Sequence, residues 1–331
     1  MTRSPGAAPE SAGDPVRARD LTRRFGSVRA VEGVSFDVRR GEMFGLIGPD
    51  GAGKTTTLRM ILGLLKPDAG EVRTCGLDPA RERRRLSSRV GYLSQRFSLY
   101  GDLTVDENVA FFAEIHDVRD YAARRDTLLE MVRMTPFRSR LADRLSGGMK
   151  QKLALVCTLV HTPELLVLDE PTTGVDPVSR RDFWKLLARL QREGLTLLLT
   201  TPYLDEAERC TRVALVDHGR LLTVETPDAL RAAERGVLVE VVAQPRRTAL
   251  TVLRETPGVA EVEVFGERLH ASLPDEAPAR GPEVASRLAA RLREAGLEVR
   301  SARPALPSLE DVFIGRIRAR EATAAAVEVT P

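Results

Sequence analysis

The chain has 331 residues, and its 50 basic and 47 acidic side chains give a formal net charge of +3. This balance excludes a strongly positive electrostatic field that would attract nucleic acid. Its length and its 43% hydrophobic content suffice for one large or two ordinary domains, and we expect two. No apolar run approaches the roughly twenty residues that span a bilayer, which predicts a soluble, cytosolic chain.

Residues 1–14 are rich in Pro, Gly, Ala and Ser and predict a disordered leader rather than a secretion signal. From Val16 to Val38, alternating apolar and polar residues predict antiparallel strands. Phe25 lies among them and either covers a sheet edge or stacks on a purine ring. The motifs that follow favour stacking.

Residues 43–47 predict a short buried strand, and the next residues match the P-loop pattern of Gly, four residues and Gly-Lys-[Ser/Thr]. The glycines let backbone N–H groups turn inward around a phosphate chain. Lys54 adds a positive charge for the β/γ-phosphates, and the Thr55 hydroxyl suits Mg²⁺. A helix behind the loop, ended by Pro67, presents its positive N-terminus to the anion. The residues predicted to bind nucleotide are Gly48, Pro49, Asp50, Gly51, Ala52, Gly53, Lys54, Thr55 and Thr56.

Gln95 follows a predicted strand that starts at Val90, and it either caps a loop or offers its carbonyl oxygen to Mg²⁺ or water. A capping box formed by Thr104 and Glu107 then starts a series of helical segments that continues to Arg144. The sequence therefore predicts an insertion of helices within an α/β domain.

Ser146, Gly147 and Gly148 precede a mostly apolar helix predicted from Lys152 to Val160. Serine and glycine at a helix N-terminus form either a plain N-cap or a second anion-binding device. Because the chain already holds a P-loop, the pattern favours two surfaces that close on one nucleotide.

Residues 165–168 form an apolar run that ends in Asp169 and Glu170, as in a central parallel strand whose C-terminal end faces an active site. The two acids form either a solvated turn or a catalytic pair, and the P-loop favours catalysis. Asp169 would hold Mg²⁺ through its water shell, whereas Glu170 would polarise the attacking water or accept its proton. Asp176 is predicted to cap the next helix, with Pro177 at its first position.

With these motifs in this order, residues 16–235 resemble the nucleotide-binding domain of ATP-binding cassette (ABC) proteins, because the Leu-Ser-Gly-Gly run at 145–148 belongs to that family. The resemblance implies an ATPase acting on Mg-ATP. It also implies that Phe25 stacks on adenine, that Gln95 is the Q-loop glutamine and that Glu170 is the catalytic carboxylate, working with Lys54.

The resemblance further implies a head-to-tail dimer, in which Ser146, Gly147 and Gly148 of one subunit close on the ATP held by the P-loop of the other. Asp176 would then lie in the loop that crosses the interface. The sequence alone leaves open whether two identical or two different cassettes pair.

The chain departs from the family at Pro202, where related cassettes usually carry a histidine that contacts the γ-phosphate. Proline has neither an imidazole nor a backbone N–H, so we expect normal ATP binding but slow hydrolysis. Asp50 adds a negative charge where the family more often has an uncharged residue. Pairing with an intact second cassette, or a side chain such as Tyr203 or His218, would restore the missing donor.

Residues 236–317 read as strand, helix, strand, strand, helix, strand, which predicts a small ferredoxin-like α+β domain without a catalytic constellation. A last helix starts at a capping box formed by Ser308 and Asp311. Its Leu-Glu-Asp-Val-Phe run resembles the C-terminal appendage of ATPase subunits in bacterial drug-type exporters. Residues 318–331 are expected to be a disordered tail.

The leading hypothesis is the ATP-hydrolysing subunit of an ABC exporter, which passes dimer closure to a separate transmembrane permease. Such a subunit would be cytoplasmic and peripheral on the inner face of the plasma membrane. The alternative is a soluble ABC ATPase that acts on nucleic acid or ribosomes. Those relatives usually carry two cassettes, a zinc-binding insertion or a long coiled coil, and none is visible in this sequence.

Overall fold

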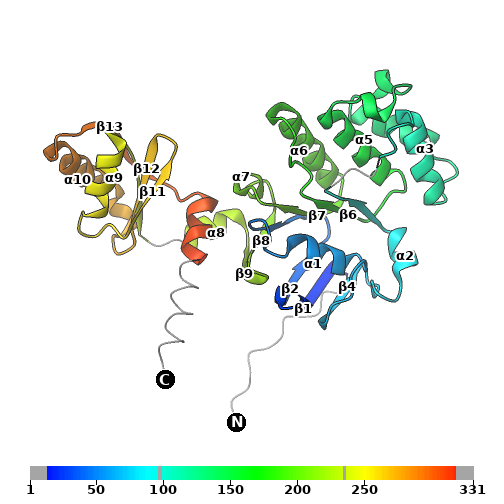
Figure 1. The fold of residues 1–331 in the computed structure, drawn as a ribbon, viewed down its shortest axis with the longest axis horizontal. Helices are drawn as coiled ribbons and strands as arrows, with labels where there is room; N and C mark the ends of the chain where they lie inside the picture. The colour runs from blue at the N-terminus through cyan, green and yellow to red at the C-terminus, as the bar shows by residue number, and fades with distance from the viewer. Residues whose placement is uncertain (1–12, 96–98, 234–235, 318–331) are drawn as a thin grey trace, which may run out of the picture. The chain divides into compact units, whose positions relative to one another are not determined.

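The computed structural model describes residues 13–95, 99–233 and 236–317. Contacts divide the chain into two compact units between Thr226 and Pro227 (Figure 1). Helix α8 (Pro227–Ala233) therefore belongs to the second unit, whereas the sequence placed the boundary after it, at residue 235. Most of the expected leader, and the whole expected tail, lie outside the described residues.

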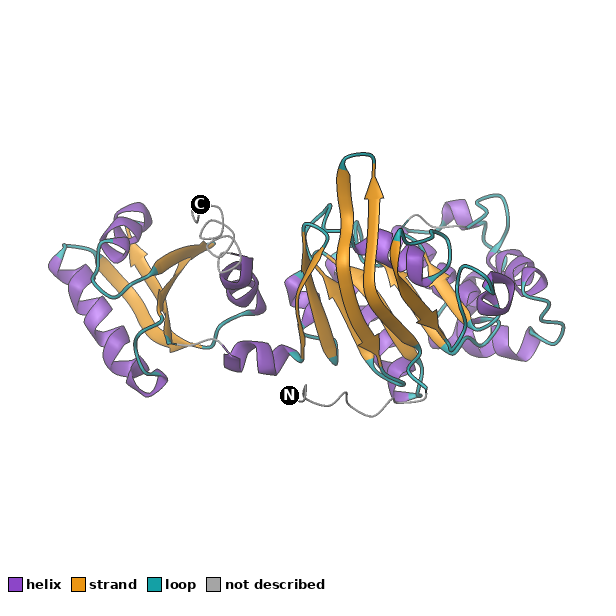
Figure 2. Ribbon diagram, turned by 90° about the horizontal axis from the view of Figure 1, so that it is seen from below, coloured by secondary structure: helices purple, strands orange, loops and turns teal. Residues whose placement is uncertain are grey.

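The first unit begins with an antiparallel sheet of strand order β2-β1-β4. Its strands are β1 (Val16–Phe25), β2 (Val28–Val38) and β4 (Ala69–Thr74). The pairing of β1 with β2 confirms the antiparallel strands predicted for this segment, and the two strands are seen along their length in Figure 2. Val16 and Ala18 of β1 face the core on alternate positions, and the alternation shifts by one residue at Asp20, so that Leu21 is the next buried side chain.

The second sheet of this unit has the order β5-β6-β7-β3-β8-β9. Neighbouring strands are parallel except for the β8–β9 pair. Its strands are β3 (Met43–Ile47), β5 (Val90–Leu93), β6 (Leu165–Asp169), β7 (Thr196–Thr201), β8 (Arg212–Asp217) and β9 (Arg220–Glu225). Every residue of β3 and β6 is buried, as expected of central parallel strands. The C-terminal ends of β3, β6 and β7 therefore meet at one edge.

Helices connect these strands. They are α1 (Lys54–Ile61), α2 (Arg83–Ser87), α3 (Val105–Ile115), α4 (Ala122–Met131), α5 (Gly147–Leu159), α6 (Pro177–Arg192) and α7 (Leu204–Ala207). The capping box predicted at Thr104 is present at the start of α3. Between α4 and α5, the predicted series of helices is represented by two short 3₁₀ turns, Thr135–Phe137 and Ala142–Arg144.

Helix α1 is shorter than the sequence predicted. It ends at Ile61, not at Pro67, because Gly63 takes the left-handed conformation with φ of 67°. The backbone N–H groups of Leu64 and Leu65 both bond to the carbonyl of Arg59, which closes the helix end.

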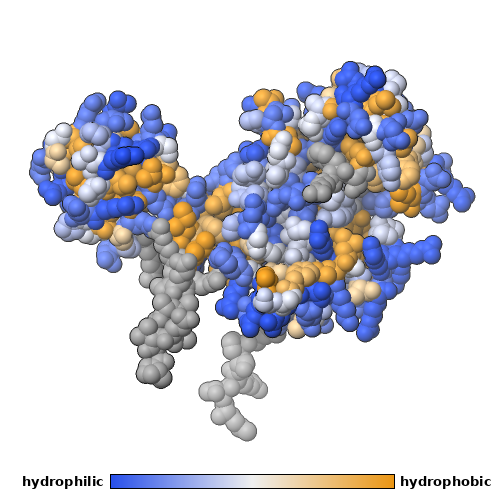
Figure 3. All heavy atoms as spheres, viewed as in Figure 1, coloured by the Kyte–Doolittle hydropathy of each residue, from blue (hydrophilic) through white to orange (hydrophobic). Residues whose placement is uncertain are grey.

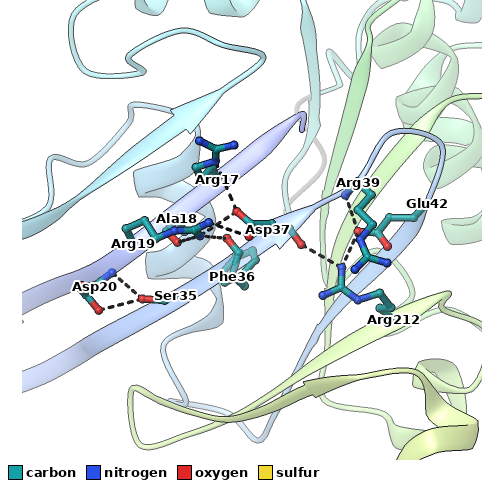
Figure 4. Close-up of polar contacts among 10 residues, drawn as sticks. All are labelled: Arg17, Ala18, Arg19, Asp20, Ser35, Phe36, Asp37, Arg39, Glu42 and Arg212. Carbon is teal, nitrogen blue, oxygen red and sulfur yellow. Dashed lines mark hydrogen bonds and ion pairs between the residues drawn. The ribbon is translucent and has the colours of Figure 1, made fainter. Parts of the chain in front are cut away.

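A polar network joins the two sheets of the first unit (Figure 4). Arg212, at the start of β8, donates to the Asp37 carbonyl and to Glu42 Oε1, each at 3.3 Å. Beside it, the rings of Phe36 and Phe44 stack with centroids 5.2 Å apart. The network anchors the antiparallel sheet next to the start of β3.

The second unit is a four-stranded antiparallel sheet of order β11-β12-β10-β13. Its elements are β10 (Val237–Gln244), α9 (Arg246–Arg254), β11 (Glu261–Phe265), β12 (Arg268–Leu273), α10 (Gly281–Glu294) and β13 (Glu298–Ala305). They follow the chain order strand, helix, strand, strand, helix, strand. The ferredoxin-like classification remains our proposal.

Helices α9 and α10 cover one face of this sheet and build its apolar core with β10 and β12 (Figure 2). Residues 309–317 form a further helix, which contacts the opposite face through an ion pair between Asp311 and His270 at 3.3 Å. Ser308 and Asp311 form the predicted capping box, because each side chain accepts a hydrogen bond from the backbone N–H of the other.

The surface seen in Figure 3 is largely hydrophilic, with smaller apolar areas between. The exposed large apolar side chains of the chain include Phe25 and Val28, which flank the β1–β2 turn. Among the described helices, none combines the length and the apolar character needed to cross a membrane.

Candidate active site

Two glycines of the P-loop are required by close backbone contacts. A Cβ at Gly48 would lie 2.1 Å from the carbonyl oxygen of Val216, and one at Gly53 would lie 2.2 Å from that of Ala30. Gly51 and Gly53 also take positive φ angles of 81° and 92°, which favour glycine. The loop therefore has a tight backbone, and its role as a phosphate cradle stays a prediction.

Lys54 is buried and directs its ammonium group to the inside of this loop. Its Nζ donates to the carbonyl oxygens of Gly48 at 2.9 Å and Pro49 at 3.0 Å. The same atom lies 3.1 Å from Glu170 Oε1. Asp50 is only 3.9 Å from Nζ, but its side chain is 92% exposed and so weakly coupled to that charge.

Thr55 and Asp169 meet although they are far apart in sequence. Thr55 Oγ1 donates to Asp169 Oδ1 at 3.0 Å, and Thr200 Oγ1 donates to the same oxygen at 2.7 Å. The hydroxyl of Tyr92 lies 3.5 Å from Asp169 Oδ2, and burial, with the Asp169 charge, raises the pKa of this tyrosine to about 12. A hydroxyl and a carboxylate oxygen thus stand side by side at the start of α1.

Glu170 lies one residue beyond β6, in a left-handed conformation with φ of 47°. Its backbone N–H donates to Thr200 Oγ1 at 2.9 Å, which fixes the turn. Its carboxylate is buried and accepts a hydrogen bond from Gln95 Nε2 at 3.0 Å. Glu170 therefore joins Lys54 on one side and Gln95 on the other.

Ser146 caps α5, and its Oγ accepts a hydrogen bond from the Met149 backbone N–H at 3.4 Å. A Cβ at Gly148 would lie 2.4 Å from Ser179 Oγ, so this glycine permits close packing against α6. A Cβ at Gly147 would meet no atom within 4 Å. Asp176 caps α6, as predicted, by accepting from the backbone N–H groups of Val178 and Ser179.

Phe25 is 49% exposed at the end of β1, with the Arg23 guanidinium 5.1 Å from its ring centroid. The side chain does not enter the sheet core. Its exposed ring is accessible to an aromatic partner, and stacking on adenine therefore stays a proposal.

Pro202 follows β7 and lies beside the P-loop strand. Thr201 pairs with Ile47, and its carbonyl oxygen accepts from Gly48 N at 3.4 Å. His218 stands in the turn after β8, with its side chain 81% exposed and its Nδ1 2.8 Å from Asp217 Oδ1. The next residue, Gly219, donates to the Ala52 carbonyl at 3.2 Å, so this turn also contacts the P-loop.

Sequence reasoning missed several polar residues that hold this site. Thr200 bridges Asp169 and Glu170, and Tyr92 approaches Asp169 from β5. Glu206, on α7, is almost fully buried with an exposed fraction of 1%. For Thr200, the sequence does offer a signal, because a polar residue at the end of an apolar strand indicates a side chain at the edge where the site lies. For Glu206 the sequence offers none, because its partners lie on three other segments.

The sequence of this chain is similar to those of known transporter proteins. Residues 31–173 match a family model described as "ABC transporter". The probable multidrug ABC transporter ATP-binding protein YbhF of Escherichia coli K12 is 43% identical over 66% of this chain, but the match spans only 38% of YbhF. The Nod factor export ATP-binding protein I of Paraburkholderia xenovorans is 40% identical over 91% of this chain and 96% of its own length.

A solved structure titled "Structure of ATP binding subunit of ABC transporter" has a TM-score of 0.60 and 31% sequence identity to this chain. The match covers 66% of this chain and 92% of the other. Together with the nearly full-length match to a 40% identical relative, it bears out the resemblance and the fold expected for residues 16–235. The chain therefore belongs to the ABC transporter family, as one of its ATP-binding proteins.

Proposed function

We propose that this protein is the ATP-binding and ATP-hydrolysing subunit of an ABC exporter, with the site around Lys54 as its catalytic centre. The observation that carries the proposal is the meeting of Lys54, Glu170 and Gln95, with distances of 3.1 Å and 3.0 Å between successive partners. These residues come from three segments, and they converge beside the glycine-rich loop.

The P-loop backbone and Lys54 would bind the phosphate chain of ATP, and Phe25 would stack on the adenine. Thr55 and Asp169 fit Mg²⁺, because their oxygens are hard donors and lie 3.0 Å apart. In the ranges 13–95, 99–233 and 236–317, no group of three or more His, Cys, Asp or Glu residues is arranged as a metal site. Mg²⁺ usually takes only one or two carboxylates and completes its shell with waters and substrate phosphates, and the residues present agree with that pattern.

Bound Mg²⁺ would neutralise charge on the phosphates. Glu170 accepts the proton of the water that attacks the γ-phosphorus, while the bond to the bridging β–γ oxygen breaks. Gln95, within hydrogen-bond reach of Glu170, orients that water, and its carbonyl oxygen would be a further ligand for Mg²⁺. Lys54 stabilises the negative charge that is transferred to the leaving phosphate oxygens.

The dimer and the membrane partner are part of the same proposal. Ser146, Gly147 and Gly148 of one subunit close on the ATP of a second, identical or different cassette, and a transmembrane permease receives that movement. The protein then works in the cytoplasm, peripheral to the inner face of the plasma membrane. The names of the two relatives, a multidrug transporter protein and a Nod factor export protein, support export, and no observation favours action on nucleic acid.

Slow hydrolysis is the distinguishing feature that we propose for this cassette. Pro202 stands beside the end of the P-loop strand and offers no donor to the γ-phosphate. The two side chains that could substitute for the histidine have other contacts: the Tyr203 ring lies 4.6 Å from the Arg180 guanidinium, and His218 Nδ1 contacts Asp217.

The proposed function is tested by purifying the full chain together with the membrane protein encoded by a neighbouring gene. We expect ATP binding by the isolated chain, Mg²⁺-dependent hydrolysis, and co-purification with the membrane protein. Purification from membranes without any integral partner, or turnover stimulated by nucleic acid, would contradict export.

A further inference from the structure

Glu206 is a buried carboxylate on α7 that accepts three hydrogen bonds. Its Oε1 accepts from Thr172 Oγ1 at 2.6 Å and from Trp184 Nε1 at 3.1 Å, and its Oε2 accepts from Thr201 Oγ1 at 2.7 Å. Arg180 Nε lies 3.6 Å from Oε1. Both carboxylate oxygens are therefore engaged by side chains from other parts of the unit.

The partners of Glu206 belong to three segments that surround the catalytic centre. Thr172 lies two residues after Glu170, in the loop that leaves β6. Thr201 is the last residue of β7 and directly precedes Pro202. Trp184 and Arg180 both lie on α6. One carboxylate thus holds the loop of the proposed base, the end of β7 and the helix α6 in a common arrangement.

A second contact reinforces this arrangement. Arg180, besides approaching Glu206, lies over the Tyr203 ring with 4.6 Å to its centroid. The two neighbours of Pro202 are therefore both restrained, Thr201 by Glu206 and Tyr203 by Arg180. Removing the buried acceptor would leave two hydroxyls and an indole N–H without their partner, which is unfavourable enough to move the loops that carry them.

We infer that Glu206 is a positioning residue for the proposed ATPase reaction. Its hydrogen bonds set the position of Glu170 relative to β7 and α6. The inference rests on the proposed function. Glu206 contacts neither the P-loop nor the Thr55–Asp169 pair in the interactions described above, so it acts on the attacking water through Glu170 and not on ATP binding. Small displacements of a catalytic group are sufficient to reduce the rate of the chemical step.

The test compares Glu206→Gln with Asp205→Asn in the full chain. Glu206→Gln keeps the side-chain size but removes the negative charge and one acceptor oxygen, whereas Asp205 is the exposed neighbouring carboxylate on the same helix. For Glu206→Gln we expect kcat to fall about 10- to 100-fold while KM for ATP and nucleotide binding stay nearly unchanged. Asp205→Asn is expected to keep the parental values.

Trp184 supplies a readout that does not depend on turnover. It is the only tryptophan of the chain, and its indole N–H donates to Glu206. We expect Mg-ATP to change its fluorescence in the parent protein, and we expect this response to be lost in Glu206→Gln. Thr172→Val and Thr201→Val each remove one donor and keep the carboxylate, so both should lower kcat by smaller factors without changing KM.

The outcomes separate this inference from the proposed function. A parent protein that neither binds nor hydrolyses ATP would overturn the proposed function itself. An active parent whose Glu206→Gln variant has parental kcat and a parental Trp184 response would overturn only the role of Glu206. A variant whose kcat and ATP-binding capacity fall by the same factor has lost folded protein, and that result would also reject a positioning role.

Discussion

The two units of the chain bury charged side chains for different purposes. In the first unit, the buried Lys54 and Glu170 pair with each other beside the glycine-rich loop. In the second, Glu240 accepts hydrogen bonds from Arg268 at 2.8 Å and Arg303 at 3.0 Å across neighbouring strands. Burial alone would raise the pKa of Glu240, but these arginines lower it below its ordinary value.

His270 and Asp311 of the second unit form a similar internal pair. The hydrogen bond with Asp311 raises the pKa of His270, although burial opposes the shift. This pair holds the helix at 309–317 on the sheet, and both residues line a small cavity together with Glu263. The comparison teaches that burial and pairing alone do not mark a charged side chain as catalytic, because both units pair the charges that they shield from solvent.

The sharpest way to break this comparison is to remove the charge at the cradle. Lys54→Ala should abolish ATP binding, because the loop loses its fixed positive charge toward the phosphates. Isothermal titration with ATP measures the effect, and Lys66→Ala, at an exposed lysine after α1, serves as the control. Binding that survives in Lys54→Ala would show that this buried charge is structural, as in the second unit.

Glu170→Gln should keep ATP binding and reduce hydrolysis by about 100-fold or more, because the amide cannot accept the proton of the attacking water. The variant should then accumulate as an ATP-bound dimer, which gel filtration with ATP detects. Hydrolysis at the parental rate would show that Glu170 is not the base.

Pro202→His tests whether the site is incomplete. Restoring one donor to the developing charge is worth around 3 kcal/mol, so steady-state hydrolysis at saturating Mg-ATP should rise up to about a hundredfold. Nucleotide binding should change little. A parent that already matches ordinary cassettes, with no gain in Pro202→His, would mean that the proline has no effect on turnover.

The helix at 309–317 should loosen as pH rises. Because the folded-state pKa of His270 is raised, its stabilising charge is complete below its unfolded pKa of about 6.5 and is lost as pH rises through the folded value. Burial raises the pKa of the facing Glu263 to about 6, with Asp311 and Glu310 adding to the shift, so its ionisation acts in the same direction.

Hydrogen exchange of the amides in residues 309–317, corrected for the intrinsic rate, measures this between pH 5 and 8.5. The helix should exchange faster at the higher pH in the parent protein. His270→Gln should flatten the dependence, since it leaves only Glu263 to titrate. A parent helix equally protected over the whole range would contradict the ion-pair explanation.

The smallest effect is expected from removing the second unit. A chain that ends at Thr226 should retain ATP binding, because every residue of the proposed site lies in the first unit. A truncated protein that keeps its circular dichroism spectrum but binds no ATP would show that the second unit contributes to the site.

The local motifs were readable from the sequence because their geometry depends on neighbouring residues. The P-loop strand was predicted at the residues that β3 occupies, and both capping boxes are present. The end of α1 was misjudged, since Pro67 signals a stop but the left-handed Gly63 ends the helix earlier. A proline only forbids continuation, whereas a glycine can close a helix before that limit.

The sequence by itself determined which groups this protein has for chemistry: a glycine loop with Lys54, a strand ending in Asp169 and Glu170, and a proline at 202. Only the tertiary structure decided which of them meet. The parallel register that sets Thr200 beside Asp169, and the loops that bring Thr172 and Thr201 to Glu206, join residues from distant parts of the chain. Such contacts depend on strand order and packing, which no local spacing of residues specifies.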